Sequence, residues 1–335
     1  MSIKPAFSKP ARIHRVQRTG RAQAFMPPTR PSALEAEGRP VITPVAGTPR
    51  TVVIATDGSR LAGSAIRVAR LMSKNGQWAP QAVTVLEPLP VSVADMTLGP
   101  PALGYQQEIT DGLLGAIETQ LVRGGGKAWK LAVQFGRAAP VIARYAREAH
   151  AGLIVLGLGK HGKLARLAGA ETAARVVRLS DVPVLAVGES VRGLPHTGVV
   201  ALDFGESSMR AARETLAFLQ PPGRLHLVHV RWAVNGQALG DSAWERTYAD
   251  GVQRGFERVV RQLGTRDGVK ITTEFVKGAV LEAILLVAKK LAADVIAAGS
   301  HSQTVLDRMI IGSTPAQLLR AAPHSVLIAA PMTVE

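Results

Sequence analysis

The sequence has no cysteine, few aromatic residues and no long apolar run, and each of these shortages excludes a class of protein. Without cysteine the chain can form no disulfide, no thiolate metal site and no cysteine nucleophile, which agrees with a cytoplasmic location. Aromatic residues make up only 4% of the 335 residues, so the core must consist mainly of aliphatic side chains. No uninterrupted apolar run approaches the roughly 20 residues that a bilayer-spanning helix needs, so we expect no membrane span.

Acidic residues are also in short supply, which leaves a formal net charge of +15. The first 50 residues hold nine lysines and arginines but only Glu35 and Glu37 as acids. This segment is rich in proline and shows no sustained helix or strand period, so we expect a disordered basic leader over residues 1–48. Such a segment attracts anionic surfaces and nucleic acids without specificity.

From Thr51 onward, short aliphatic runs alternate with segments of helical period. The pattern predicts strands from Thr51 and at 81–87, 130–135, 152–157 and 183–187, and helices at 59–74, 106–122, 139–149 and near 171–179. Strands that alternate with helices indicate parallel pairing through right-handed crossovers. The runs are almost continuously aliphatic, as expected where helices cover both faces of a sheet.

The same order of segments then repeats. Gly136 and Gly278, Gly157 and Gly299, and Val184 and Val326 are all separated by 142 residues. Equal offsets in three different elements indicate a duplication, with a joint at about 189–197. We therefore expect a first domain at residues 49–190 and a second at 197–331.

The residues that carry the strongest family likeness lie in the second half, where Gly299, two residues, Ser302, nine residues and Gly312-Ser313 form one spaced motif. This pattern resembles that of the universal stress protein family, in which ATP-binding members carry a glycine at the position of Ser302. The resemblance covers both halves. It implies an α/β fold of two Rossmann-like (adenine nucleotide alpha hydrolase-like) domains, each a five-stranded parallel sheet with helices on both faces.

The resemblance also implies a nucleotide site in the second half. Asp203 and Val230 would line the adenine and ribose end, and the phosphates would be held by Gly299, Ser300, His301, Ser302, Gly312, Ser313 and Thr314. Independent physical reasoning supports the same place. Gly299 ends a strand, where a glycine backbone can approach a phosphate and tolerate a positive φ. The helix expected after Gly312 would present free N–H groups and its positive dipole end.

The first half departs further from the family pattern. Asp57 and Val85 match the adenosine-end positions, but an equal offset places Glu171 where the last helix should begin. A carboxylate there would satisfy the free N–H groups itself and repel a phosphate. We therefore expect a degenerate site in this half.

Two function classes remain open. The first is a nucleotide-binding stress or regulatory protein that uses ATP or another adenine nucleotide, with or without Mg²⁺, and is read by a protein partner. The second is a scaffold that binds no ATP and acts through paired domains and the basic leader. Pairing of residues 184–187 with 326–329 would make the monomer a pseudo-dimer and close two exposed strand edges. A further homo-oligomer remains open.

The remaining sequence features are weaker evidence of function. His226 and His229 are expected on one strand and on the same side of it, yet no third metal ligand is fixed near them. The segment from Gly157 to Leu164 is similar to the P-loop motif, but it has Leu164 in place of the serine or threonine that would bind Mg²⁺. No catalytic constellation is present, so at most weak ATP hydrolysis is expected. Nucleic-acid binding rests on charge alone and is not favoured.

Overall fold

The computed structural model describes residues 49–74, 76–87, 101–126, 128–158, 163–189, 191–232, 242–300 and 313–331. Residues 47–335 form one compact unit. The expected basic leader lies outside the described residues. Among the residues described, no helix is long and apolar enough to cross a membrane.

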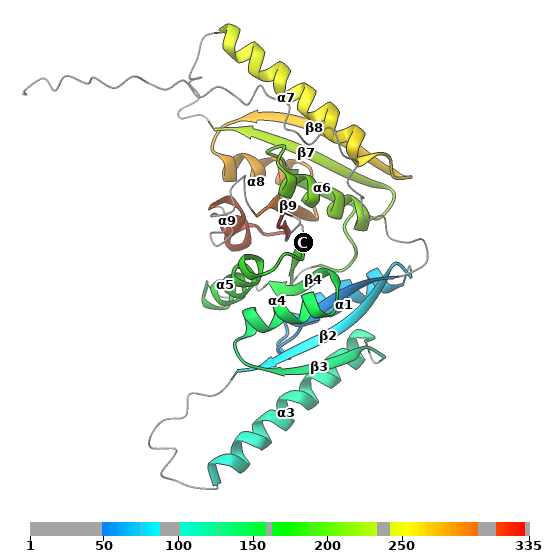
Figure 1. The fold of residues 1–335 in the computed structure, drawn as a ribbon, viewed down its shortest axis with the longest axis vertical. Coiled ribbons are helices and arrows are strands. Elements are labelled where there is room, and N and C mark those ends of the chain that lie inside the picture. The colour runs from blue at the N-terminus through cyan, green and yellow to red at the C-terminus, as the bar shows by residue number, and fades with distance from the viewer. Residues whose placement is uncertain are drawn as a thin grey trace, which may run out of the picture. The chain divides into compact units, whose positions relative to one another are not determined.

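Strands and helices alternate within each half of the compact unit (Figure 1). The first half contains β1 (Arg50–Ala55), α1 (Ala62–Ser73), β2 (Trp78–Leu86), α3 (Pro101–Gly124), β3 (Lys130–Phe135), α4 (Ala138–Glu148), β4 (Ala151–Leu158), α5 (Lys163–Leu179) and β5 (Val184–Gly188). The second half contains β6 (Thr197–Ala201), α6 (Glu206–Phe218), β7 (Gly223–Arg231), α7 (Ser242–Leu263), β8 (Val269–Lys277), α8 (Val280–Lys290), β9 (Val295–Gly299), α9 (Ser313–Ala321) and β10 (Ser325–Ala329).

The ten strands found in the described ranges belong to one sheet, in the order β3-β2-β1-β4-β5-β10-β9-β6-β7-β8. Strand pairing is parallel within each half, and β5 and β10 join the halves antiparallel, with Leu327 opposite Leu185. This confirms the expected pairing of residues 184–187 with 326–329. Each of these strands is thereby covered on both sides, which removes the edges that would otherwise be open to aggregation.

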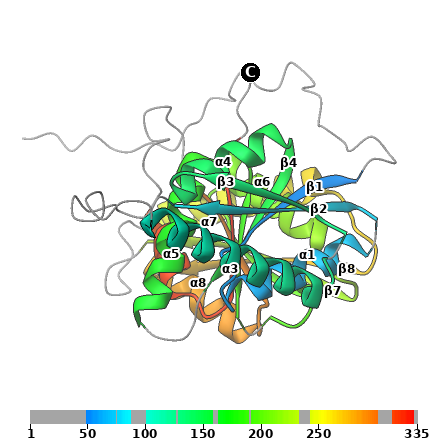
Figure 2. The ribbon, with the colours of Figure 1, turned by 90° about the horizontal axis from the view of Figure 1, so that it is seen from below.

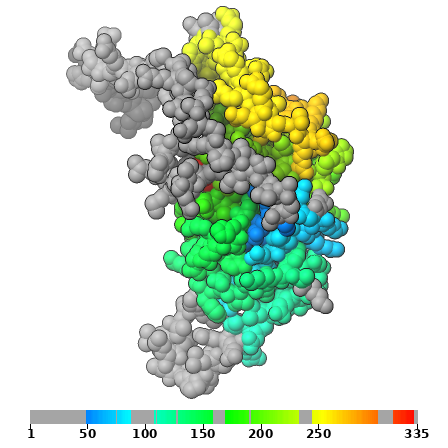
Figure 3. Space-filling model, turned by 45° about the vertical axis from the view of Figure 1, so that its right-hand side comes forward, coloured from blue at the N-terminus to red at the C-terminus, as the bar shows by residue number. Residues whose placement is uncertain are grey.

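Helices lie on both faces of the sheet (Figure 2). One buried cluster joins α1, α3, α6 and α7 to the strands, and a second cluster joins α4, α5, α8 and α9 to the opposite face. Each cluster contains residues of both halves, so the core is continuous across the β5–β10 junction. On the surface, the cyan atoms of the first half and the yellow and orange atoms of the second occupy separate regions (Figure 3).

The backbone confirms the duplication at points that side chains alone would not reveal. Gly136 and Gly278 both have a positive φ, at 130° and 154°. His150 and Ala292 also pair, with φ of 47° and 49°. Each pair is separated by the same 142 residues found in the sequence, so the two halves turn in the same way after equivalent elements.

Candidate functional site

Strand register brings three of the expected site residues to one edge of the sheet. Ala201 of β6 lies opposite Val228 of β7 on one side and Ala298 of β9 on the other. Two residues beyond these positions come Asp203 after Ala201, Val230 after Val228 and Ser300 after Ala298. The chain leaves β6 toward β7 on one side, and β9 flanks it on the other, so this edge is a topological switch point, where open α/β sheets bind ligands.

Asp203 uses one carboxylate oxygen to hold the turn between β6 and α6. Its Oδ1 accepts hydrogen bonds from the Gly205 N–H at 2.9 Å and the Ser208 hydroxyl at 2.5 Å. Within the described part of the chain no hydrogen bond to Oδ2 is found, and the residue is exposed. The carboxylate is therefore oriented by its own turn, and one oxygen is free for a ligand hydroxyl.

The structure corrects the role expected for Gly299. Its φ is not positive, so the backbone does not require glycine for its conformation. A Cβ at Gly299 would instead lie 2.4 Å from Ser207 Oγ and 2.7 Å from the Ser208 nitrogen. The glycine is required because the first turn of α6 packs directly on the end of β9.

The phosphate end of the expected site is described only in part. Ser300 is buried, and its N–H donates to the Ala329 carbonyl at 2.8 Å. The backbone of α9 begins at Ser313, and Thr314 follows as a half-buried residue in its first turn. His301, Ser302 and Gly312 lie outside the described residues. An α-helix that begins at Ser313 leaves the N–H groups of its first turn without partners inside the helix.

The first half contains a cavity at the equivalent strand ends. It has a volume of about 380 Å³ and is lined by Asp57, Val85, Gly157 and one side of α5, among others. Asp57 resembles Asp203 in that its Oδ1 accepts a hydrogen bond from the N–H two residues ahead, at 2.9 Å from the Ser59 nitrogen. The residues expected at the adenosine end of this half, Asp57 and Val85, therefore line a cavity.

The expectation that Glu171 occupies a helix start in the first half is wrong. Helix α5 begins at Lys163, eight residues before Glu171, so no free N–H groups surround this carboxylate. Glu171 forms ion pairs with Arg175, at 3.3 Å, and with Arg320 of α9, at 3.5 Å. The equal offset failed here because α5 and α9 begin at different points of the repeat. Any loss of phosphate binding in this half needs another cause, such as the passage of α5 beside the cavity.

A ring cluster beside the candidate site had not been predicted. The Nδ1–H of His229 donates to the Leu202 carbonyl at 2.7 Å, which leaves Nε2 to accept from the Tyr248 hydroxyl at 2.9 Å. Phe204 has a φ of 64° and packs on the same imidazole, with ring centroids 4.8 Å apart. The cluster joins the β6–α6 turn to α7, and no local sequence pattern marks it.

His226 and His229 do not form a metal site. They are three positions apart on β7, and side chains alternate between the two faces of a strand. The expectation that they face the same side is therefore wrong. His226 lies on the opposite face, where its ring contacts Thr272 at 2.8 Å and Glu274 at 3.0 Å. Among the described residues no group of three or more histidine, aspartate or glutamate side chains could hold a metal ion.

Burial makes both histidines sensitive to acid. Desolvation is the main cause that lowers the pKa of His229, and the same cause lowers the pKa of His226 despite Glu274. In each case the unfolded chain binds more protons, so the free energy of unfolding should fall as the pH drops below about 6.5. The stability is fully present above that pH.

Urea unfolding between pH 5 and 8 measures this dependence. We expect a shallower pH slope for His229→Gln than for the parent, because the glutamine amide cannot titrate. His150→Asn is the matched control, since His150 is exposed and asparagine tolerates its positive φ. Equal slopes for the parent and His229→Gln would contradict the assignment.

Comparison with known proteins agrees with this geometry. A model of the universal stress protein family matches residues 48–188 and again residues 197–330. A universal stress protein from Archaeoglobus fulgidus is similar in fold, with a TM-score of 0.57 and 18% identity over 85% of this chain and 97% of that one. One from Pseudomonas aeruginosa has a TM-score of 0.58 and 16% identity over 84% of this chain and 94% of that one.

A universal stress protein solved in complex with cAMP is 24% identical over 41% of this chain and 98% of that one, with a TM-score of 0.29. Comparison with curated protein sequences gives no significant match. The two family matches together cover most of the chain, and the strand order, the duplication and the similar folds agree with them. The chain therefore belongs to the universal stress protein family, as a tandem member with two family domains.

Proposed function

We propose that the second half binds an adenine nucleotide and that its occupancy regulates a surface read by a protein partner. The observation that carries this proposal is the strand register that sets Asp203, Val230 and Ser300 at one edge, at a topological switch point. ATP, with or without Mg²⁺, is the ligand that the family resemblance implies. It would supply phosphate charge to the site, and no hydrolytic step is assigned to it.

The described residues fit such a ligand. The free Oδ2 of Asp203 would accept a hydrogen bond from a ribose hydroxyl, and the half-buried Val230 would contact the base. The N–H groups at the start of α9, at Ser313 and Thr314, would donate to the phosphates. Gly299 acts indirectly, because it allows α6 and its Asp203 turn to lie against β9. His301, Ser302 and Gly312 complete the proposed phosphate loop.

A second candidate site is the cavity of the first half, which is favoured by its volume of about 380 Å³ and its Asp57. This volume falls in the range of small-molecule pockets. Because α5 runs along the cavity, a ligand there would place its base and ribose against Asp57 and Val85. The two halves would then bind the same type of ligand with different affinities.

Calorimetric titration with MgATP tests the proposal with matched variants. Asp203→Ala should lower the affinity about tenfold, because it removes a charge-assisted hydrogen bond to the ligand. Gly312→Asp should abolish binding in the second half, because it places a negative charge beside the phosphates. Asp57→Ala is the matched control, since Asp57 holds an equivalent turn in the other half.

The stoichiometry separates the two sites. One bound nucleotide that is lost in Gly312→Asp and kept in Asp57→Ala supports the second half alone. Two bound nucleotides, of which Asp57→Ala weakens one about tenfold, would add the first half. Equal affinity of the parent and Gly312→Asp would contradict the proposal, and no binding to the parent would favour the scaffold function.

A further inference from the structure

A second cavity, of about 410 Å³, lies where the two halves meet. It is bordered by the end of β5 and by the starts of β6, β9 and β10, and the connecting segment Val191–His196 lines it on one side. The proposed nucleotide site lies at the opposite ends of β6 and β9. The cavity is therefore separate from that site.

Internal symmetry shows why this space is open. Around the first strand and helix of each half, equivalent residues are 146 apart: Gly157 packs on Leu61 and Ala62, and Gly299 packs on Ser207 and Ser208. With this offset, His196 of the cavity corresponds to Arg50, and its Val68 corresponds to Glu214. The equivalent place on the other side of the junction therefore lies beside Arg50 and Glu214.

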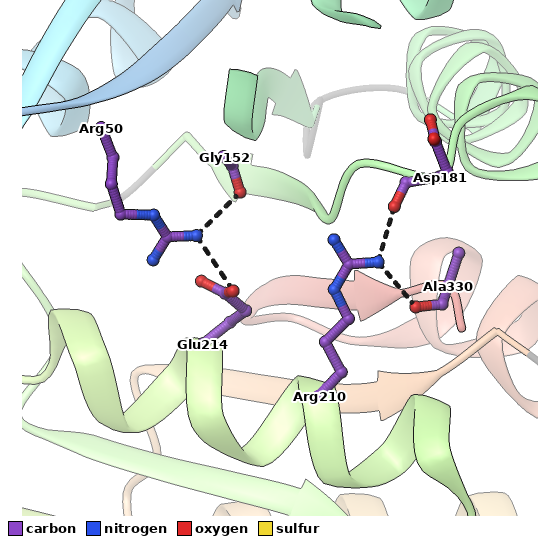
Figure 4. Close-up of polar contacts among 6 residues, drawn as sticks. All are labelled: Arg50, Gly152, Asp181, Arg210, Glu214 and Ala330. Carbon is purple, nitrogen blue, oxygen red and sulfur yellow. Dashed lines mark hydrogen bonds and ion pairs between the residues drawn. The ribbon is translucent and has the colours of Figure 1, made fainter. Parts of the chain in front are cut away.

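Long charged side chains fill that equivalent place (Figure 4). Arg50 donates to the Gly152 carbonyl at 3.3 Å and pairs with Glu214 at 3.0 Å. Arg210 of α6 donates to the carbonyls of Asp181 and Ala330, at 2.7 and 3.0 Å. On the cavity side, the residues that correspond to Arg50, Glu214 and Arg210 are shorter: His196, Val68 and Ser64. The cavity exists because no long side chain occupies it.

The walls of the cavity are largely aliphatic, and two of its basic residues, Arg192 and His196, lie in the connecting segment. The apolar walls include Val68, Leu185, Val187, Leu194, Phe218 and Val295. Arg192 and His196 are both exposed and line the same space. Within the described part of the chain, Arg192 takes part in no ion pair.

The single acid of the cavity is already engaged. Oδ2 of Asp294 accepts hydrogen bonds from the N–H groups of His196, at 2.8 Å, and Thr197, at 2.9 Å. Nδ1 of His196 contacts the Pro222 carbonyl at 3.1 Å, and no partner of its Nε2 is found among the described residues. Because Nδ1 faces a carbonyl, it is the donor of this ring, so the donors left for a ligand are those of the Arg192 guanidinium, next to the apolar wall.

We propose that this cavity binds a small amphipathic carboxylate, with its hydrocarbon part against the aliphatic wall and its carboxylate against the Arg192 guanidinium. The volume fits a pocket for a small molecule, and such pockets are common at domain interfaces. A carboxylate is the group that a guanidinium recognises best, because it can accept two parallel hydrogen bonds. Binding there would contact both halves at once.

Calorimetry with octanoate on the full chain tests the proposal, with 1-octanol as the neutral probe of equal length. Octanoate should bind with one-to-one stoichiometry and at least fivefold more tightly than octanol. Arg192→Gln should reduce octanoate to the affinity of octanol. Gly193→Trp should lower the affinity for both probes at least tenfold, since Gly193 lines the cavity and a Cβ there meets no atom within 4 Å. Val68→Phe, which adds volume from the wall, should do the same.

The controls are Arg123→Gln and Gly112→Trp on α3, a helix that contributes no residue to the cavity lining. Both should bind octanoate like the parent. Binding that persists unchanged in both Gly193→Trp and Val68→Phe would overturn the proposal, as would equal affinity for octanoate and octanol. Saturating MgATP should leave octanoate binding unchanged, and competition between the two would place octanoate elsewhere and also overturn it.

Discussion

Replacing Gly157 by alanine should destabilise the protein by about 3 kcal/mol, the upper part of the usual range for overpacking a core. The added Cβ would lie 2.3 Å from the Leu61 carbonyl oxygen and 2.9 Å from the Ala62 nitrogen. Both atoms belong to the backbone at the start of α1, so no side-chain rotation can relieve the contact. Either β4 or α1 must move, and both contribute to the shared core.

Gly299→Ala should have a similar but smaller effect. The nearest atom to its Cβ is Ser207 Oγ, at 2.4 Å, and this side chain has some freedom to rotate, but the Ser208 nitrogen follows at 2.7 Å. Gly112→Ala is the matched control, because a Cβ at that exposed helical position meets nothing within 4 Å. It should stabilise α3 by roughly 0.5–1 kcal/mol. Urea unfolding measures all three, and a loss in Gly157→Ala no larger than about 0.5 kcal/mol would contradict the packing argument.

Replacing Arg210 by methionine should destabilise the protein by about 2–3 kcal/mol. The guanidinium donates to two carbonyls on opposite sides of the junction, one from Asp181 before β5 and one from Ala330 after β10. Methionine keeps most of the volume but leaves both carbonyls without this donor. Burial lowers the pKa of Arg210, yet an arginine remains charged at neutral pH, so Glu214 also loses a nearby positive charge.

Arg213→Met is the matched control, since Arg213 lies on the same helix and is exposed. It should change the free energy of unfolding by less than about 0.5 kcal/mol. Urea unfolding followed by circular dichroism gives both values. The transition of Arg210→Met should remain a single step, because the two halves share one continuous core. An equal stability of the two variants would show that water replaces the guanidinium at both carbonyls.

Much of the fold could be read from local patterns and from the repeat. Short aliphatic runs predicted the parallel strands, and the offset of 142 residues predicted two similar halves, as the paired φ values of His150 and Ala292 confirm. The pairing of residues 184–187 with 326–329 was expected from the family resemblance, and it covers two strand edges that would otherwise be exposed. These features depend on residue types and spacings that recur along the chain.

The expectations that were wrong concern where a helix begins, which face of a strand a residue takes, and contacts between segments far apart in sequence. Glu171 was placed at a helix start by counting residues, but helix formation began at Lys163, where the local sequence already favours it. Gly299 was assigned a conformational role, but its small size serves the packing of α6. The ring cluster around His229 joins β7 to α7 and the β6–α6 turn, and each of its members is unremarkable in its own segment.

The sequence thus contained the fold class, the duplication and the succession of strands and helices along the chain, since periodicity and repetition are properties of the chain itself. Only the tertiary structure decided which glycines are needed for packing, where α5 begins and which side of the junction is filled. Arg50 and Arg210 occupy one side of the junction, while the shorter His196 and Val68 line the open cavity on the other. Such asymmetry depends on the reach of particular side chains across an interface, which no spacing along the chain reveals.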